Sequence, residues 1–393
     1  MRNLLSWFVG RPTQTAGGDL PAVRQLNDLK GKRVLLRASL NVPIENGKVA
    51  ETFRLEQALP TIDFLKEQGA KVIVIGHIGR EPEESLEPVH KALSKMTEIA
   101  WGGGLKEAAA VVSALRDGEA ILLENLRQDA RESAGDESLA KELAALADIY
   151  VNDAFSDSHR EHASITGVPM YLPSCFGDGF LREYKELKKA MKPEHPSLFI
   201  LGGAKFETKM PLVERYTAIY DVIYVGGALA NDIYKAKGYE VGTSLVSDID
   251  LSKNTIIEDP KIMVPGDVVV EDGDGKKEVG IRAILPDESI LDIGPVSLKE
   301  LDALVSEAKT ILWNGPLGNF EKGFSMGTEM LAQSIARSNA FSVVGGGDTI
   351  AAIRSLGLTD RFGFMSTAGG AMLVFLETGT LSGIEAVLKN PIK

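Results

Sequence analysis

Arginine and histidine side chains follow four apolar segments in the first half of the chain, where strands of a buried sheet would end. The segments are VLLRASLNVP, GHIGRE, ENLR and NDAFSDSHREH, and they supply Arg37, Ser39, Asn41, His77, Arg80, Arg127, His159, Arg160 and His162. Cations gathered at one edge of a sheet repel one another unless an anion lies between them. Planar guanidinium groups bind phosphate or carboxylate with paired hydrogen bonds. The pattern therefore predicts a site for a small anion.

These side chains have two other possible roles. A single arginine at a strand end is most often a surface residue or an ion-pair partner, but four strand ends with the same chemistry favour a shared ligand. The histidines could instead bind a metal, yet no close set of His, Cys and Asp has the spacing of a zinc site.

Glycines take the place of arginines in the second half. Five apolar segments run into GGAKFETK, GGALAN, NGPLGNFE, GGGDT and STAGGAM. Glycine lets a backbone approach a ligand closely, and amides at a following helix N-terminus attract phosphate. Any one GG pair is most simply a tight turn. Five such junctions in one domain, two with lysines and one with Asp348, predict a site for nucleotide phosphates and a metal ion.

Familiar motifs that would identify another chemistry are absent. The sequence contains neither GxxxxGK[ST] nor GxGxxG, so the P-loop and the dinucleotide fingerprint do not apply. It also lacks the GxSxG elbow of an acyl hydrolase.

The elements that must position these residues alternate along the chain. Short apolar runs indicate strands covered on both faces, and the segments between them have helical periodicity, for example at Leu55–Gln68, Ser138–Ala147 and Thr328–Ser338. The runs are Val34–Arg37, Val72–Ile75, Ala120–Leu123, Ile149–Val151, Leu198–Leu201, Val222–Val225, Ile311–Trp313 and Phe341–Val344. This alternation predicts an α/β fold with two doubly wound parallel sheets.

Two segments fall outside the alternation. Gly177–Pro196 is charged and helical and ends at prolines, so we expect it to be the hinge helix and linker between two domains. The region 245–295 is irregular, and EDGDGKKEVG within it is typical of a solvated hairpin or loop.

Composition narrows the class of protein. The chain has 393 residues, 44% apolar and 25% charged, and this predicts a globular protein of two or three domains. A net charge of −12 argues against duplex nucleic acid and anionic membranes as partners. The single cysteine, Cys175, fits a reducing compartment, and we expect a cytoplasmic protein without a signal peptide or a membrane helix.

From about Asn27 to its end the chain resembles the phosphoglycerate kinases. The matching segments, in order, are RASLNVP, the helix led by Arg54, GHIGR, LLENLR, VNDAFSDSHREHAS, LGGAK, ILWNGPLGNFE, GTE, VVGGGDT and STAGGA. The resemblance implies two Rossmann-like domains and a monomer. It implies reversible transfer of the acyl phosphate of 1,3-bisphosphoglycerate to Mg-ADP, which gives 3-phosphoglycerate and ATP. The implied domain bounds are 1–176, 177–196 for the hinge, 197–375, and 376–393 for a tail that returns to the first domain.

For the first domain, the resemblance implies a set of contacts with the glycerate. Ser39 and Asn41 would contact the glycerate, and Arg54 its carboxyl end and the transferring phosphoryl group. The segment around the non-reacting 3-phosphate would comprise His77, Ile78, Gly79, Arg80, Arg127 and Arg160. Arg37 is expected to be a structural residue, paired near the site.

For the second domain, the resemblance implies a nucleotide site with a catalytic role for Lys205, Lys209, Gly369 and Gly370. Asp348 would bind Mg²⁺, Thr349 the phosphates and Glu321 the ribose. The remaining nucleotide contacts would come from Gly203, Gly226, Gly227, Asn314, Gly346 and Gly347.

Several positions differ from the family pattern. An Asp is usual at Ser39, a Gly-Thr-Ala triplet at Ser156-Asp157-Ser158, and a glycine at Ala228, while TGGGAS is here TAGGAM. A hydroxyl at Ser39 lacks the charge that strengthens an ionised acceptor, so we expect weakened glycerate recognition. Two alternatives stay open: a catalytically silent relative, and a kinase for a different carboxylate.

Overall fold

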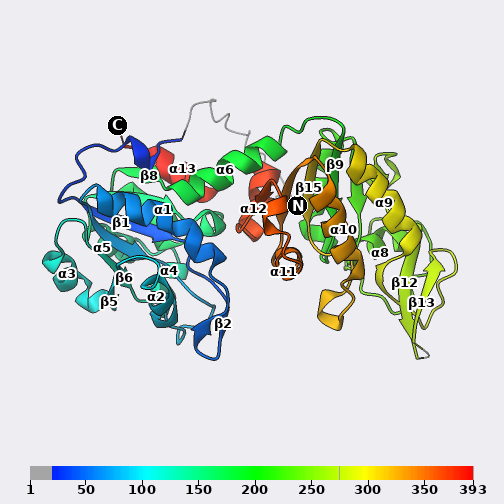
Figure 1. Cartoon of the computed structure of the whole chain (residues 1–393), viewed down its shortest axis with the longest axis horizontal. Helices are drawn as coiled ribbons and strands as arrows, with labels where there is room; N and C mark the ends of the chain where they lie inside the picture. The colour runs from blue at the N-terminus through cyan, green and yellow to red at the C-terminus, as the bar shows by residue number, and fades with distance from the viewer. Residues whose placement is uncertain (1–19, 274, 393) are drawn as a thin grey trace, which may run out of the picture. The chain divides into compact units, whose positions relative to one another are not determined.

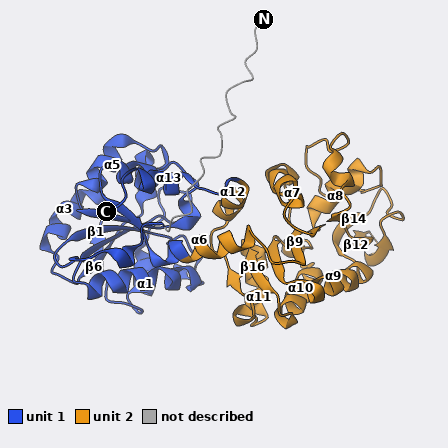
Figure 2. Ribbon diagram, turned by 90° about the horizontal axis from the view of Figure 1, so that it is seen from above, with its two compact units in different colours: residues 1–181, 378–393 blue, residues 182–377 orange. Residues whose placement is uncertain are grey.

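The computed structural model describes residues 20–273 and 275–392, which form two compact units (Figure 2). Unit 1 contains the described residues up to Leu181 together with those from Thr378 onward, and unit 2 runs from Arg182 to Glu377. The expectation that the chain has no signal peptide concerns residues 1–19, which lie outside the described part of the chain.

A six-stranded parallel sheet forms the centre of unit 1, in the order β5-β6-β4-β1-β7-β8 (Figure 1). The strands are β1 (Arg33–Ala38), β4 (Lys71–Ile75), β5 (Ala100–Gly103), β6 (Ala120–Leu123), β7 (Ile149–Asp153) and β8 (Ser174–Phe176). The central strand β1 is apolar and buried because it pairs on both sides, Val34 with Val72 of β4 and with Ile149 of β7. A separate small hairpin is formed by β2 (Ile44–Glu45) and β3 (Lys48–Val49).

Helices supply the other half of each core face in unit 1. Helix α1 (Phe53–Glu67) buries Leu55, Ile62 and Leu65 in one cluster with Val34 and Val72 of the sheet. The other helices are α2 (Glu87–Leu93), α3 (Leu105–Ala114), α4 (Ala130–Ser133), α5 (Glu137–Ala144) and α13 (Ser382–Lys389). The C-terminal segment is part of this unit: the N–H of Gly383 donates to Ser158 O, and the N–H of Ser174 donates to Asn390 O.

Unit 2 repeats the architecture with a parallel sheet of order β11-β10-β9-β15-β16-β17. Its strands are β9 (Ser197–Leu201), β10 (Val222–Val225), β11 (Ile262–Met263), β15 (Thr310–Asn314), β16 (Phe341–Gly345) and β17 (Phe364–Met365). The surrounding helices are α7 (Met210–Thr217), α8 (Ala228–Ala236), α9 (Pro295–Glu307), α10 (Met326–Arg337), α11 (Gly347–Ser355) and α12 (Gly370–Thr378). The prediction of two doubly wound parallel sheets is confirmed.

The irregular region contains a second, antiparallel sheet. EDGDGKKEVG contains the end of β12 (Asp267–Asp272) and all of β13 (Gly275–Gly280), which pair as a hairpin, and β14 (Ser289–Ile293) pairs with the other side of β12. The hairpin agrees with the sequence, whereas β14 was not predicted. Valines of β12 pack with Ala230 and Tyr234 of α8, so this small sheet extends the core of unit 2.

Within Gly177–Pro196, helix α6 spans Asp178–Ala190 and carries the boundary between the units at Leu181. Among the described residues no single helix is long and apolar enough to cross a membrane; α12 and α13 meet that test only when taken together.

Candidate functional sites in the two units

The four strands β1, β4, β6 and β7 end at the same edge of the unit 1 sheet, because they are adjacent and parallel. The predicted cationic residues follow these strands and lie close enough to shift one another's pKa. Arg37 and Arg160 both lower the pKa of Arg127, after burial as the main cause. The sequence-predicted cluster therefore exists, and it contains Arg37, Arg54, His77, Arg127, Arg160 and His162.

Arg37 is a buried member of this cluster, and its partners are other protein atoms. Its side chain is fully buried and donates to Ser164 Oγ at 2.9 Å, to Ala38 O at 2.7 Å and to His77 Nδ1 at 2.9 Å. Because arginine can only donate, Nδ1 of His77 is the acceptor and the proton of its neutral ring lies on Nε2. Arg37 thus has the structural, paired position expected of it.

A buried carboxylate, Asp157, balances the cations. Its oxygens lie 3.5 Å from Arg37 Nη1 and 3.7 Å from His77 Nε2. Burial alone would raise the pKa of Asp157, but His77, Arg37, Arg160 and Arg54 outweigh it and hold the pKa at about 2. Asp157 is therefore ionised throughout the ordinary pH range. Sequence reasoning missed its role, although SDSHREH places this acid beside the cations.

The two buried histidines of the cluster are neutral. Burial lowers the pKa of His77 to about 3, with further lowering by the arginines. Burial likewise lowers the pKa of His162 to about 4. The Nε2 of His77 and the Nε of Arg127 are buried without a hydrogen-bond partner among the described residues. Buried polar groups of this kind are usually paired, so the cluster has donors left for a ligand.

Glu132 is a second buried carboxyl group next to the cluster. It is fully buried and accepts from the backbone N–H of Ser164 at 2.9 Å and from Ser164 Oγ at 2.5 Å. Burial raises its pKa, while the nearby Arg37 opposes that shift. Ser164 thus joins Glu132 to Arg37 and fixes the guanidinium in place.

Asn41, Gly79 and Arg54 are connected through backbone groups. Asn41 Oδ1 accepts from the N–H of Gly79 at 3.0 Å, and Asn41 O accepts from Arg54 Nη1. Arg127 Nη1 in turn donates to the carbonyl of Gly79. Gly79 has φ +63°, and a Cβ there would overlap the Glu84 carboxylate, so glycine is required.

Ser39 and Arg80 differ from this set in their surroundings. The hydroxyl of Ser39 lies 2.6 Å from that of Ser156, which contacts Asp157 Oδ2 at 3.4 Å. The Arg80 side chain is exposed, and its backbone N–H donates to Glu84 Oε2 at 2.6 Å. Ile78 is buried, with its N–H on Asn125 Oδ1 at 3.2 Å. The structure brings Ser39 beside the cluster but does not place Arg80 within it.

At the carboxyl edge of the unit 2 sheet, neighbouring loops contact one another through backbone atoms. Gly202 N–H donates to Asn314 O at 2.8 Å, and Gly203 N–H donates to Pro316 O at 2.7 Å. Gly315 has φ +92°, and a Cβ there would lie 2.4 Å from Gly202 O. Only glycines allow these loops to pass so closely. Glycine at positions 202 and 315 is therefore required by the packing of these strand ends.

The predicted lysines occupy different environments. Lys209 is buried, and its Nζ donates to Gly202 O at 2.7 Å and Ala204 O at 3.3 Å; burial lowers its pKa to about 8. Lys205 is exposed and has φ +66°. Lys209 thus stabilises the glycine loop through hydrogen bonds to two of its carbonyl groups, while Lys205 is exposed to solvent.

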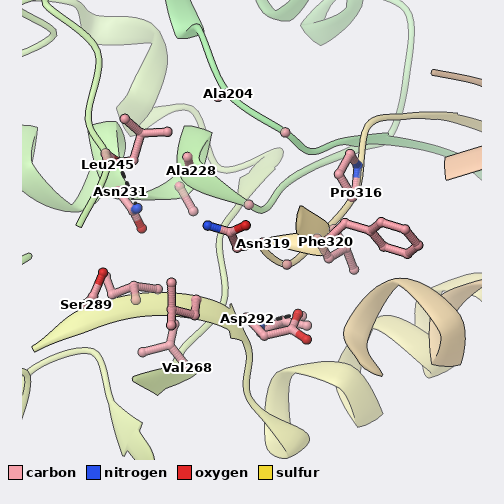
Figure 3. Close-up of a pocket in the computed structure, with 18 of the residues that line it drawn as sticks. Ala204, Ala228, Asn231, Leu245, Val268, Ser289, Asp292, Pro316, Asn319 and Phe320 are labelled. Atoms are coloured by element: carbon pink, nitrogen blue, oxygen red, sulfur yellow. Dashed lines mark hydrogen bonds between the residues drawn. The ribbon is translucent and has the colours of Figure 1, made fainter. Parts of the chain in front are cut away.

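A cavity of about 450 Å³ opens beside these loops in unit 2 (Figure 3). Its lining includes the predicted residues Gly203, Gly227 and Asp348, together with unpredicted ones such as Asn231, Asp292 and Asn319. Gly226 precedes this lining, with its N–H on Leu201 O at 2.8 Å. Burial raises the pKa of Asp292 to about 6. The volume suits a ligand of nucleotide size.

Helix α11 begins at the mouth of this cavity. Gly346 has φ +103°, Gly347 starts the helix, and the Asp348 side chain is exposed. Thr349 Oγ1 is buried and has no hydrogen-bond partner among the described residues. A helix N-terminus with an unpaired hydroxyl is a suitable site for phosphate oxygens.

The STAGGAM loop is anchored through Glu183 of α6. Glu183 accepts from the hydroxyl of Ser366 at 2.8 Å and from the N–H and hydroxyl of Thr367 at 2.7 and 2.9 Å. Gly369 follows with φ +56° in open space, and Gly370 begins α12. Asn314 is buried with its Nδ2 3.9 Å from Met372 Sδ. The side chain of Glu321 lies outside the described part of the structure.

No group of three or more His, Cys, Asp and Glu side chains within the described ranges is arranged to hold a metal ion. A divalent ion bound by these residues would therefore need oxygen atoms of a bound ligand as well.

Comparisons with known proteins give one consistent result over more than nine-tenths of the chain. The family model described as "Phosphoglycerate kinase" matches residues 23–379. Curated proteins of that name from Pelotomaculum thermopropionicum and Francisella tularensis subsp. novicida are 40% identical over 382 residues and 41% identical over 391 residues. The alignments cover 92% and 93% of this chain and 97% and 98% of the relatives.

Solved structures agree with the sequence comparison. Phosphoglycerate kinase from Coxiella burnetii matches with a TM-score of 0.82 and 38% identity, covering 94% of this chain and 98% of that one. The Pyrococcus horikoshii OT3 enzyme has the same TM-score at 30% identity and covers 94% and 100%. With its arginine cluster in one unit and its glycine-lined cavity in the other, the chain belongs to the phosphoglycerate kinase family.

Proposed function

We propose that the chain transfers the acyl phosphate of 1,3-bisphosphoglycerate to Mg-ADP, reversibly, giving 3-phosphoglycerate and ATP. The observation that carries this proposal is the excess of cations at the carboxyl edge of the unit 1 sheet. Four arginines lie around two carboxyl groups there, so the cluster needs an anionic ligand: Arg37, Arg54, Arg127, Arg160, Asp157 and Glu132.

In unit 1 we assign the glycerate to the rim of this cluster. Ser39 and Asn41 contact the glycerate, and Arg54 neutralises its carboxyl end and the transferring group. The 3-phosphate is bound by the residues around Gly79, namely His77, Ile78, Arg80, Arg127 and Arg160. Buried Arg37 and Asp157 support this role because they fix His77 from behind.

In unit 2 we assign the nucleotide to the cavity of Figure 3. The phosphates lie at the start of α11 and at the lysine loop, with Thr349, Lys205 and Lys209 as their contacts, and Glu321 binds the ribose. Gly369 and Gly370 offer backbone N–H groups to the transferred group. The floor of the site is formed by Gly203, Gly226, Gly227, Asn314, Gly346 and Gly347.

The reaction needs positioning and charge neutralisation more than proton transfer. In the direction of ATP use the nucleophile is a carboxylate, which is already ionised near neutral pH, so no general base is required. Arginines, lysines and helix N-termini neutralise the charge that develops on the phosphoryl oxygens.

The residues present fit a magnesium ion. Mg²⁺ in kinases is held by one or two carboxylates and by substrate phosphates, and Asp348 is an exposed carboxylate at the cavity. When bound, the ion supplies charge neutralisation to the nucleotide phosphates. A monomeric state and a cytoplasmic location are further parts of the proposal, taken from the family resemblance.

A coupled assay with Mg-ATP and 3-phosphoglycerate tests the function. We expect turnover that depends on both substrates and on Mg²⁺. Absence of turnover would support the catalytically silent alternative, and turnover only with another carboxylate would support a different substrate. Calorimetry then measures whether the protein binds 3-phosphoglycerate. This measurement separates an inactive protein that still binds 3-phosphoglycerate from one that no longer binds it.

A further inference from the structure

Asn231 on α8 presents an unusual buried acceptor to the nucleotide cavity. The residue is 2% exposed and lines the cavity. Its Oδ1 is buried and accepts no hydrogen bond from any described residue. Native structures leave few buried polar atoms unpaired, and an unpaired atom in a ligand cavity is commonly satisfied by the ligand.

The orientation of the Asn231 amide is fixed by its other end. Nδ2 donates to the carbonyl oxygen of Leu245 at 3.0 Å. Rotating the amide by 180° would place Oδ1 against that carbonyl, and two acceptors cannot bond each other. Asn231 therefore offers the cavity an acceptor and no donor.

The surroundings of Asn231 suit a base rather than a phosphate. We assigned the phosphates to the start of α11, at Asp348, whereas Asn231 lies on α8, one helical turn or about 6 Å beyond its N-cap Gly227. Figure 3 shows Asn231 beside Leu245, with Ala228 and Ser289 nearby and Val268 across the cavity. The lining of the cavity includes the apolar side chains of Tyr234, Leu245, Val268, Ile290 and Leu291 as well as the amide of Asn319.

An acceptor among apolar walls discriminates between purines. Adenine has an amino group at C6, which donates, whereas guanine and hypoxanthine have a carbonyl oxygen there, which would face Oδ1 of Asn231 as a second acceptor. The Ser289 hydroxyl can rotate and either donate or accept, so it cannot make this distinction.

We propose that Asn231 is the specificity-determining residue of the nucleotide site and selects adenine nucleotides by accepting a hydrogen bond from the C6 amino group. The proposal rests on the proposed function in one respect, since it takes the cavity to be the nucleotide site. A single neutral hydrogen bond corresponds to roughly a 2- to 12-fold difference in affinity.

Calorimetry with three diphosphates tests the proposal: ADP, purine riboside diphosphate, which lacks the amino group, and IDP, which has the carbonyl. For the unmodified chain we expect ADP to bind about 10-fold more tightly than purine riboside diphosphate, and IDP to bind more weakly still. In Asn231→Leu the ADP preference should fall to within about twofold. The control Ser289→Ala should keep it.

Two results would overturn the proposal. One is equal affinity of the unmodified chain for ADP and purine riboside diphosphate, which needs no variant and so decides the matter even if Asn231→Leu fails to fold. The other is a folded Asn231→Leu protein that retains the full preference. A chain that discriminates among the three ligands but does not phosphorylate 3-phosphoglycerate would refute the proposed function alone. Normal turnover without discrimination would refute only the role of Asn231.

Discussion

In both units the candidate site lies at the carboxyl edge of a parallel sheet, but side chains form most of the site in unit 1 and backbone atoms form most of it in unit 2. In unit 1 the strand ends carry charged side chains whose positions depend on buried counter-charges such as Asp157. In unit 2 the strand ends carry glycines, and the loops contact one another through backbone atoms, as at Gly202 and Asn314.

This difference teaches what each site can tolerate. A site made of side-chain charge depends on which groups are ionised and on how each ion is balanced. A site made of backbone depends on space, because a Cβ at Gly202, Gly227 or Gly315 would meet a neighbouring loop. Unit 1 should therefore be sensitive to changes of charge, and unit 2 to changes of volume.

The largest effect is expected from Arg54→Ala in unit 1. Arginines that neutralise a transferring phosphoryl group contribute about 10³-fold or more to turnover in other phosphotransferases. We expect kcat to fall about 10³-fold, while the Kd for 3-phosphoglycerate changes much less, because the charge being stabilised develops during transfer. Steady-state kinetics and calorimetry measure the two quantities. Arg116→Ala, an exposed arginine of the same unit, is the control; near-normal turnover of Arg54→Ala would contradict the assignment.

Asp157→Asn tests the buried counter-charge of unit 1. Removing one partner of a buried ion pair leaves the other uncompensated, so we expect a loss of about 3 kcal/mol in the free energy of unfolding. The exposed pair of Asp148 with Arg33 provides the control, and Asp148→Asn should cost less than about 1 kcal/mol. Chemical denaturation measures both variants.

The same variant should change the response to acid. Because the folded pKa of Asp157 is about 2, below its ordinary 3.8, its stabilisation is present above pH 4 and is lost as the pH falls toward 2. Asp157→Asn should flatten this part of the stability profile. An unchanged acid limb would show that Asp157 is not the counter-charge we describe.

A smaller effect, of the opposite kind, is expected from Gly315→Ala in unit 2. The substitution changes no charge, but it places a Cβ 2.4 Å from Gly202 O at a backbone with φ +92°. We expect a loss of about 1–3 kcal/mol in stability and weaker ADP binding, with the 3-phosphoglycerate Kd unchanged. Gly266→Ala, with nothing within 4 Å of the new Cβ, should be nearly neutral. Equal effects of the two substitutions would end the contrast between the units.

The strands that carry the sites could be predicted from the sequence because each is a short apolar run followed by a polar residue or a glycine. The edge strands β5, β8, β11 and β17, which are only two to four residues long, were not predicted. Strand β14, which pairs with β12 in the small antiparallel sheet, was not predicted either. Such short strands are specified by the neighbour they pair with rather than by their own pattern.

The same distinction applies to the site residues. Arg127 and Arg160 were predicted because charge after an apolar run is unusual. Asn231 was not, because its significance lies in an unpaired oxygen, which depends on the position of Leu245 fourteen residues away. Hydrogen-bond satisfaction is a property of the folded chain and has no local signal in the sequence.

Ser39→Asp sharpens the comparison most finely, because it adds charge to unit 1 with little change in volume. The Ser39 hydroxyl now meets that of Ser156 at 2.6 Å, and a carboxylate there would accept from Ser156 and from the alcohol of the substrate. Ionised acceptors form stronger hydrogen bonds than hydroxyls, so we expect the KM for 3-phosphoglycerate to fall about 5-fold. Ser39→Ala, which removes the acceptor, should raise it.

The nearby Asp157 opposes this gain, since its carboxylate lies 3.4 Å from Ser156 Oγ and would repel a second negative charge. Arg37, Arg54 and Arg160 near Asp157 limit that repulsion. A KM that is unchanged or higher in Ser39→Asp would mean that Asp157 already supplies the charge that other family members place at position 39. The double variant Ser39→Asp with Asp157→Asn would then recover the lower KM.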